Sequence, residues 1–346
     1  MRFIFWLIIA ILLINCGDLT KRGSLKPLGK IVLIFNNIPE NHRYEFPTGI
    51  TTNNGGFEIY YINDDGLPQF LIPNKKKSDT VVITTKRDII EIEHAYRGAD
   101  KLSFFFQNGD TINFRYEEKM PFASINNGSE GDGVNFDPIV RKSVQHGDFP
   151  ASIKYSSPFA FQEFPKISYE VENLKAMENF KLIAHAEHAA EKKLLDSLTL
   201  KKEISAARSK LLKLKNKYDS LSFAHQTNTI KILPSKYLDN DSLLFFPFYN
   251  HFLDVLLRNY YSRGAPTIKI GNAFAPNYET VYDSIKTNGK ITVATKSVLL
   301  RMALQEIIFS GDVRSIRKYS SDFISTTKDS VSLKFLFKEN RIDLPF

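Results

Sequence analysis

The chain has little cysteine: Cys16 is the only one among its 346 residues. A single cysteine excludes an intramolecular disulfide and the paired-cysteine motifs of thiol oxidoreductases and zinc sites. The sequence also lacks GxGxxG, a Walker loop and Gly-x-Ser-x-Gly, which hold dinucleotides, nucleoside triphosphates and a nucleophilic serine. We therefore predict a protein that is not an enzyme, with no catalytic residues and no cofactor.

No apolar run reaches the roughly 20 residues that a transmembrane helix needs. The run at residues 3–14 follows Arg2 and has the length of the apolar part of a signal peptide. The stretch Leu13, Ile14, Asn15 and Cys16 resembles a bacterial lipobox, although Asn15 stands where a small residue is usual. This resemblance implies that residues 1–15 are a lipoprotein signal peptide and that Cys16 is lipidated. The alternative is an uncleaved anchor with an incidental cysteine.

Residues 16–29 are polar, contain glycine and proline, and are predicted to be a tether. Asp18 is the only acid before Lys21 and Arg22, which favours a periplasm-facing protein over one sent to the cell surface. The formal net charge of +8 would suit nucleic acid or anionic lipid. No dense basic patch with interleaved aromatic residues stands out, so we predict a membrane contact through the acyl anchor and no nucleic-acid partner.

Short strand-like runs separated by turn residues occupy residues 30–118. Such spacing predicts an antiparallel, β-sandwich-like domain. Residues 102–106 and 111–116 look like the two strands of a hairpin joined at residues 107–110. Residues 119–170 are predicted to be an irregular connector between domains.

From residue 171 the pattern changes to helix, and neither glycine nor proline occurs before Leu233. Residues 171–226 are predicted to form a long helix with a coiled-coil seam and a bend near Ser197, where the heptad phase breaks. Further helical runs at 241–264, 297–309, 313–324 and 331–337 predict a small bundle over residues 227–346. The expected fold class is α+β. The seam's second phase comprises Leu200, Ile204, Ala207, Leu211, Leu214, Tyr218 and Leu221.

Two stretches resemble metal sites. His185, His188 and Glu191 fall on successive turns of one helical face, but without the HExxH spacing they are interpreted as surface groups. Residues 126–137 resemble a calcium loop, yet Gly128 offers no side-chain oxygen at its third position, so a flexible connector is favoured. We predict no metal site.

An Asp-Ser/Thr-apolar triplet recurs in the chain, and exported Bacteroidota proteins are O-glycosylated at such triplets. Exposed copies are therefore candidate glycan sites, while the alternative is that Asp and Ser start turns and helices before apolar runs. The triplets begin at Asp79, Asp110, Asp196, Asp219, Asp241, Asp283 and Asp329.

The layout resembles the N-terminal, β plus helical portion of TlpA/thioredoxin-like lipoproteins of the Bacteroidota. The resemblance lies in the lipobox, the Gly109-Asp110-Thr111 turn and the segment 299–312, with Lys318, Tyr319 and Phe323 beyond it. It implies the accessory part of such a protein without the C-terminal thioredoxin domain.

The predicted function is a non-catalytic, membrane-anchored lipoprotein of the cell envelope that acts as a binding or scaffold module for an envelope protein partner. One alternative is an accessory component or remnant of a thioredoxin-like reductase system. Another is a glycan-binding lipoprotein that uses Tyr60, Tyr61 and residues 104–106 as a sugar platform.

Overall fold

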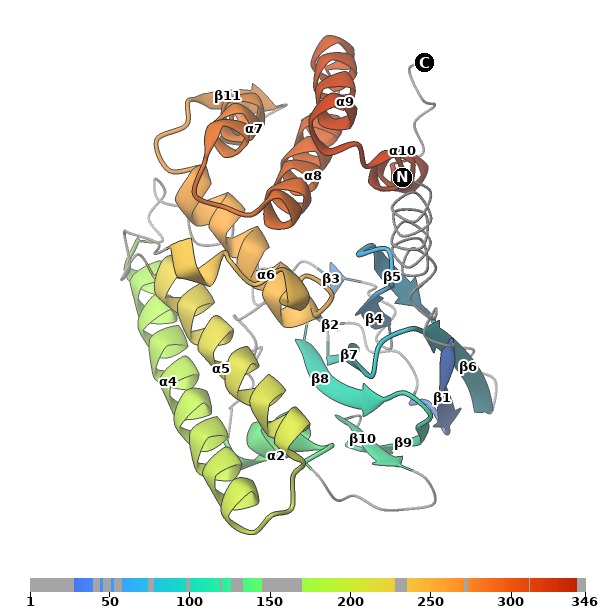
Figure 1. Ribbon diagram of the computed structural model, residues 1–346. Coiled ribbons are helices and arrows are strands. Elements are labelled where there is room, and N and C mark those ends of the chain that lie inside the picture. Colours follow the sequence, from blue (N-terminus) through green and yellow to red (C-terminus); the bar gives the residue numbers. More distant parts are fainter. Residues whose placement is uncertain are drawn as a thin grey trace, which may run out of the picture.

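The computed structural model describes residues 28–39, 44–45, 51–52, 58–73, 78–97, 100–118, 120–125, 133–144, 170–227, 235–270, 273–310 and 312–340. Strands dominate up to Ile125 and helices dominate after it, which confirms the α+β class. In Figure 1 the strands up to β10 lie on one side of the molecule, α4 and α5 lie along the other, and β11 lies with the C-terminal helices above.

Two four-stranded sheets carry most of the strands, in the orders β10-β9-β1-β6 and β5-β4-β7-β8. The short pairs β2-β3 and β11-β12 are separate. The strands are β1 (Gly29–Asn36), β2 (Tyr44–Glu45), β3 (Thr51–Thr52), β4 (Ile59–Ile62), β5 (Pro68–Leu71), β6 (Ser78–Thr85), β7 (Ile89–Arg97), β8 (Asp100–Gln107), β9 (Thr111–Glu117), β10 (Met120–Ile125), β11 (Thr267–Ile270) and β12 (Ala273–Pro276).

The two large sheets pack face to face as a sandwich, because alternate side chains of each strand point to a shared core. Ile31, Leu33 and Phe35 of β1 are buried there together with residues of β7, β8 and β9. The rings of Phe104 and Phe114 meet edge to face across the sheets, 5.4 Å between centroids. The sandwich prediction is therefore confirmed in its architecture.

Two details of the predicted β region are wrong. The expected hairpin at residues 102–116 does not form, because β8 pairs with β7 while β9 pairs with β1 and β10 in the other sheet. The turn at residues 108–110 therefore crosses from one sheet to the other. The sandwich is also not purely antiparallel, since β1 and β9 run parallel with Val32 opposite Thr111.

The predicted irregular connector at 119–170 contains regular structure. Met120–Ile125 is β10, which completes the first sheet, and Phe136–Ser143 is helix α2. Helix α2 packs on β8, β10 and α4. Asn135 fixes the start of α2 to the sheet, because its side chain accepts from Ala123 N at 2.7 Å and donates to Ala123 O at 2.8 Å.

The long helix predicted over 171–226 is instead a helical hairpin. Helix α4 (Glu170–Leu200) ends three residues after the predicted phase break at Ser197, and α5 (Ala206–Gln226) runs back along it. Ser205 caps α5 by accepting a hydrogen bond from Arg208 N. The predicted coiled-coil seam thus packs mainly against helices of the same chain, and Figure 1 shows α4 and α5 side by side.

The C-terminal region is mostly helical, as predicted, but the sequence pattern missed α7 and the hairpin β11-β12. Among the described residues no helix is both long and apolar enough to cross a bilayer. The helices are η1 (Ser235–Tyr237), η2 (Asp241–Leu243), α6 (Pro247–Leu256), the π-helical turn η3 (Leu257–Tyr261), α7 (Tyr278–Thr287), α8 (Val293–Ser310), α9 (Val313–Thr327) and α10 (Ser330–Glu339).

The second sheet is covered on both faces. Phe104 and Phe106 of β8 point into the sandwich, whereas Phe105 between them belongs to the core of the helical region. The ring of Phe105 lies 6.4 Å from that of Phe248 on α6. The sandwich and the helices therefore share a packed interface and not only a linker.

Replacing Phe105 with Ala tests this interface. Removing a buried aromatic ring leaves a cavity, so the free energy of unfolding should fall by about 3–5 kcal/mol in urea titrations. The matched control Phe70→Ala alters a ring that is 49% exposed on β5 and should cost less than about 1 kcal/mol. Equal losses in the two variants would contradict a packed interface at Phe105.

Candidate functional site

The most unusual chemistry lies where the sandwich meets the helices. Charged side chains from six elements of the chain converge there, and most are buried. They are Glu91 and Glu93 of β7, Lys101 of β8, Asp137 and Arg141 of α2, Glu187 and Glu191 of α4, Lys215 and Asp219 of α5, and His251 of α6. We call this set the charged junction.

The strand period explains why β7 brings two carboxylates to the interface. Ile90 and Ile92 fill the sandwich core, so the alternate residues Glu91 and Glu93 must face the helices. Both are 1% exposed. In the sequence this alternation is typical of a strand with one wet face, which is why these residues were missed.

Glu91 is bound to the start of α6. Its Oε2 accepts a hydrogen bond from Phe248 N at 3.0 Å, in the first turn after Pro247. The N-terminus of a helix favours a negative charge. Burial and the neighbouring charge of Glu93 outweigh this effect and raise the pKa of Glu91 well above its ordinary value. Glu91 therefore takes up a proton more readily than an ordinary glutamate does.

Glu93 is held in the charged form. Burial opposes its charge, but His251 and Lys101 together outweigh burial and lower the pKa of Glu93. Its Oε1 lies 2.8 Å from His251 Nε2, and its Oε2 lies 3.5 Å from Lys101 Nζ. The Lys101 ammonium also lies 4.7 Å from the centre of the Tyr60 ring. Two carboxyl groups whose pKa values are shifted in opposite directions therefore lie two residues apart on one strand.

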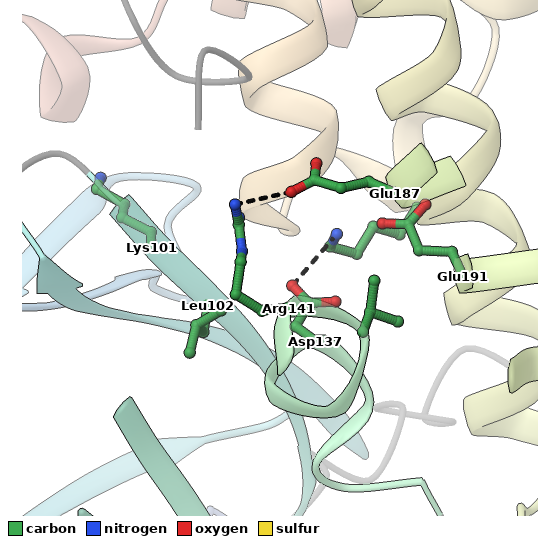
Figure 2. Close-up of a pocket in the computed structure, with 8 residues that line it drawn as sticks. Lys101, Leu102, Asp137, Arg141, Glu187 and Glu191 are labelled. Atoms are coloured by element: carbon green, nitrogen blue, oxygen red, sulfur yellow. Dashed lines mark ion pairs between the residues drawn. The ribbon is translucent and has the colours of Figure 1, made fainter. Parts of the chain in front are cut away.

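A small pocket, which Lys101 also lines, lies between α2, α4, α5 and β8 (Figure 2). Arg141 Nη1 is 2.7 Å from Glu187 Oε1. Lys215 Nζ is 3.4 Å from Asp137 Oδ2 and 2.9 Å from Asp219 Oδ2. The Arg141–Glu187 and Lys215–Asp137 pairs join elements far apart in sequence. The arrangement acts as an ionic clamp between α2 and the helical hairpin.

The backbone and neutral side chains complete the clamp. Asp137 Oδ2 also accepts from Ser103 N of β8 at 3.0 Å, and Glu191 accepts from the Asn216 amide at 2.5 Å. Each carboxylate therefore links its helix to another element. Such groups are well placed to fix geometry, because buried charges are tolerated only when paired and hydrogen-bonded.

The side chains of His185, His188 and Glu191, which resemble a metal site in the sequence, contact other residues in the structure. The rings of His185 and His188 both pack edge-on against Phe223 of α5, while Glu191 faces Asn216. Within the described ranges no group of three His, Cys, Asp or Glu side chains is arranged to hold a metal ion. The resemblance at 126–137 to a calcium loop falls mostly outside the described residues. Its last member, Asp137, binds Ser103 N and Lys215.

Residues 104–106 cannot be part of the proposed sugar platform, whereas Tyr60 and Tyr61 are half-buried and glycan binding stays a prediction. Phe104, Phe105 and Phe106 are each at most 2% exposed and fill two cores. This corrects the expectation that residues 104–106 offer aromatic faces to a glycan, because alternate strand positions are buried on both sides of this sheet. Cys16 and the tether up to residue 27 lie outside the described residues.

The Asp-Ser/Thr triplets include turn and helix starts. Asp329 caps α10 by accepting from Ser332 N at 2.9 Å, and Asp110 Oδ2 accepts from Gln107 N at 2.7 Å in the sheet-crossing turn. The hydroxyl residues of four triplets are exposed, and their glycosylation stays a prediction. These four are Thr80, Ser242, Ser284 and Ser330.

Comparison with known proteins yields no relative: no protein family, no curated protein and no solved structure matches the chain. The resemblance to thioredoxin-like lipoproteins therefore remains a prediction.

The raised pKa of Glu91 predicts a pH dependence of stability. A raised folded-state pKa stabilises the fold fully below the ordinary carboxyl pKa, and this contribution is lost as pH rises toward the folded-state value. Glu91→Gln mimics the protonated form, so its stability relative to wild type should increase as pH rises above about 4.5. Urea unfolding from pH 4 to 8 measures this difference, and a pH-independent difference would contradict it.

The ion pair of Arg141 and Glu187 predicts strong coupling. Arg141→Met removes the guanidinium from a buried carboxylate and should cost about 3–5 kcal/mol in free energy of unfolding. Adding Glu187→Leu to the same chain should recover most of that loss, because no charge is then left buried at the pair. Additive losses in this double-mutant cycle would show that the pair does not act as a unit.

Proposed function

We propose that the chain is a non-catalytic, lipid-anchored lipoprotein of the cell envelope, facing the periplasm, whose body is a binding or scaffold module. The observation that carries the proposal is the position of Cys16, which follows Arg2, the apolar run at residues 3–14 and Asn15. An apolar run of that length suits a signal peptide better than a membrane span. Acyl chains on one cysteine hold a protein at a bilayer through their buried methylenes.

The charged junction supports the scaffold part of the proposal. Its carboxylates and cations are bound to one another across β7, α2, α4, α5 and α6. They tie the sandwich to the helices, and a body held in this way presents its outer surfaces in a fixed arrangement. Binding surfaces benefit from such preorganisation, because less conformational entropy is lost when a partner docks.

Cys16→Ala tests the anchor. In cells, wild type should fractionate with membranes and have the mass of the chain from Cys16 onward plus acyl chains. The variant should be unacylated and should leave the membrane or remain unprocessed. Ser24→Ala, in the predicted tether, is the matched control and should behave as wild type. Identical mass and fractionation of wild type and Cys16→Ala would overturn the lipoprotein proposal.

A further inference from the structure

The turn of the α4-α5 hairpin carries a concentration of exposed lysines. Leu200 is 85% exposed at the end of α4, and residues 201–205 join it to α5. Figure 1 shows this turn at an extremity of the molecule, beyond α2. The exposed lysines nearby are Lys192, Lys193, Lys201, Lys202, Lys210 and Lys213. We call these six lysines and Leu200 the hairpin tip.

The six lysines all lie near the turn along the axes of the two helices. With a rise of 1.5 Å per residue, Lys192 is about 12 Å along α4 from Leu200, and Lys213 is about 10 Å along α5 from its start. The exposed acids in the same stretch are Asp196 and Glu203. The tip therefore has a clear excess of positive charge.

The lysines of the hairpin tip on α5 lie on a different face of the helix from the residues of the charged junction. Arg208 and Lys215 of α5 are 2% exposed and point inward, and Lys215 is bound to Asp137 and Asp219. Lys210 and Lys213 lie on the opposite face of the helix. The tip is thus a distinct surface, and the carboxylates of the junction do not neutralise it.

The backbone of the tip turns through a left-handed residue. Lys202 has φ 58°, the left-handed position after a helix that glycine usually occupies. Glu203 N bonds to Leu198 O at 3.0 Å across this turn, which holds it closed. Adjacent Lys201 and Lys202 are thereby held beside the exposed Leu200.

We propose that the hairpin tip docks on an anionic phospholipid bilayer, with Leu200 entering the interface and the lysines meeting lipid phosphates. Lysines around an exposed apolar residue are the arrangement that interfacial proteins use. All six cations are lysine, whereas nucleic acids are typically read by arginine, whose planar fork binds phosphates and bases in a bidentate manner. Residues 192–213 also contain no aromatic side chain on which a base could stack.

Vesicle flotation with the full chain tests the proposal. The chain is mixed with neutral phosphatidylcholine vesicles and then with labelled acceptor vesicles containing equal parts phosphatidylglycerol and phosphatidylcholine. Capture by anionic acceptors, and not by neutral ones, is the expected result. Capture should weaken as salt rises from about 10 to about 150 mM, where the screening length falls from about 30 to about 8 Å. If the N-terminus does not hold the chain on neutral vesicles, the binding of the free chain to the acceptor vesicles is measured instead. The docking of the hairpin tip is thus tested even if the lipid anchor is absent.

Variants assign the binding to the tip. Lys201→Gln with Lys202→Gln should weaken capture about 25-fold, since each lysine near an anionic surface contributes about fivefold. Leu200→Ser should weaken it several-fold without changing the salt dependence. The matched control Lys334→Gln with Lys338→Gln removes two exposed lysines from α10 and should stay within about twofold of wild type. Urea unfolding of each variant checks that the fold is retained.

Three results would overturn the proposal. The first is equal capture of neutral and anionic acceptors, and the second is equal losses in the tip and α10 variants. The third is binding of a duplex DNA fragment, at matched phosphate concentration, as strong as vesicle binding and equally sensitive to the tip variant. That last result would assign the surface to a soluble polyanion.

Discussion

The placement of two carboxyl groups, Glu91 and Glu93, between a sandwich and a set of helices constrains the rest of the structure. Taking a charge out of water costs several kcal/mol unless close partners replace the solvent. Here the partners come from α6 and β8, and the ion pair between α2 and α5 belongs to the same charged junction. The sandwich and helices therefore fit in one arrangement, because any slip would leave a buried carboxyl without its donor.

This constraint also determines the position of the helical hairpin. Lys215 of α5 must reach Asp137 of α2, and Glu187 of α4 must reach Arg141 of the same short helix. Both contacts fix the phase of α4 and α5 about their axes. The inward faces are thereby assigned to the junction and the core. The opposite faces, with the lysines of the hairpin tip, are directed to solvent.

Local patterns in the sequence predicted most strands of the sandwich, but not β10, and helices α8 to α10, whose apolar spacing reflects a single buried face. They could not predict which strands pair, because the period of residues 102–116 is the same whether β8 and β9 share a sheet or lie in two. Glu91 and Glu93 were missed for a related reason. Strand β7 is buried on both faces by different layers, but one of those faces carries acids. Its apolar and acidic residues therefore alternate as they would in a strand with one face exposed to solvent.

The amino-acid composition also could not predict which charged side chains are buried and which are exposed. Lys213 and Lys215 are two residues apart in sequence, yet a helix turns about 200° between them, so one reaches solvent and the other a buried pair of aspartates. The net charge of +8 is thus a sum over groups with opposite roles. Buried Lys215 stabilises the junction through Asp219 on its own helix and Asp137 on the distant helix α2. The exposed lysines gather only once residues 201–205 reverse the chain, so no linear window of sequence shows the patch that they form.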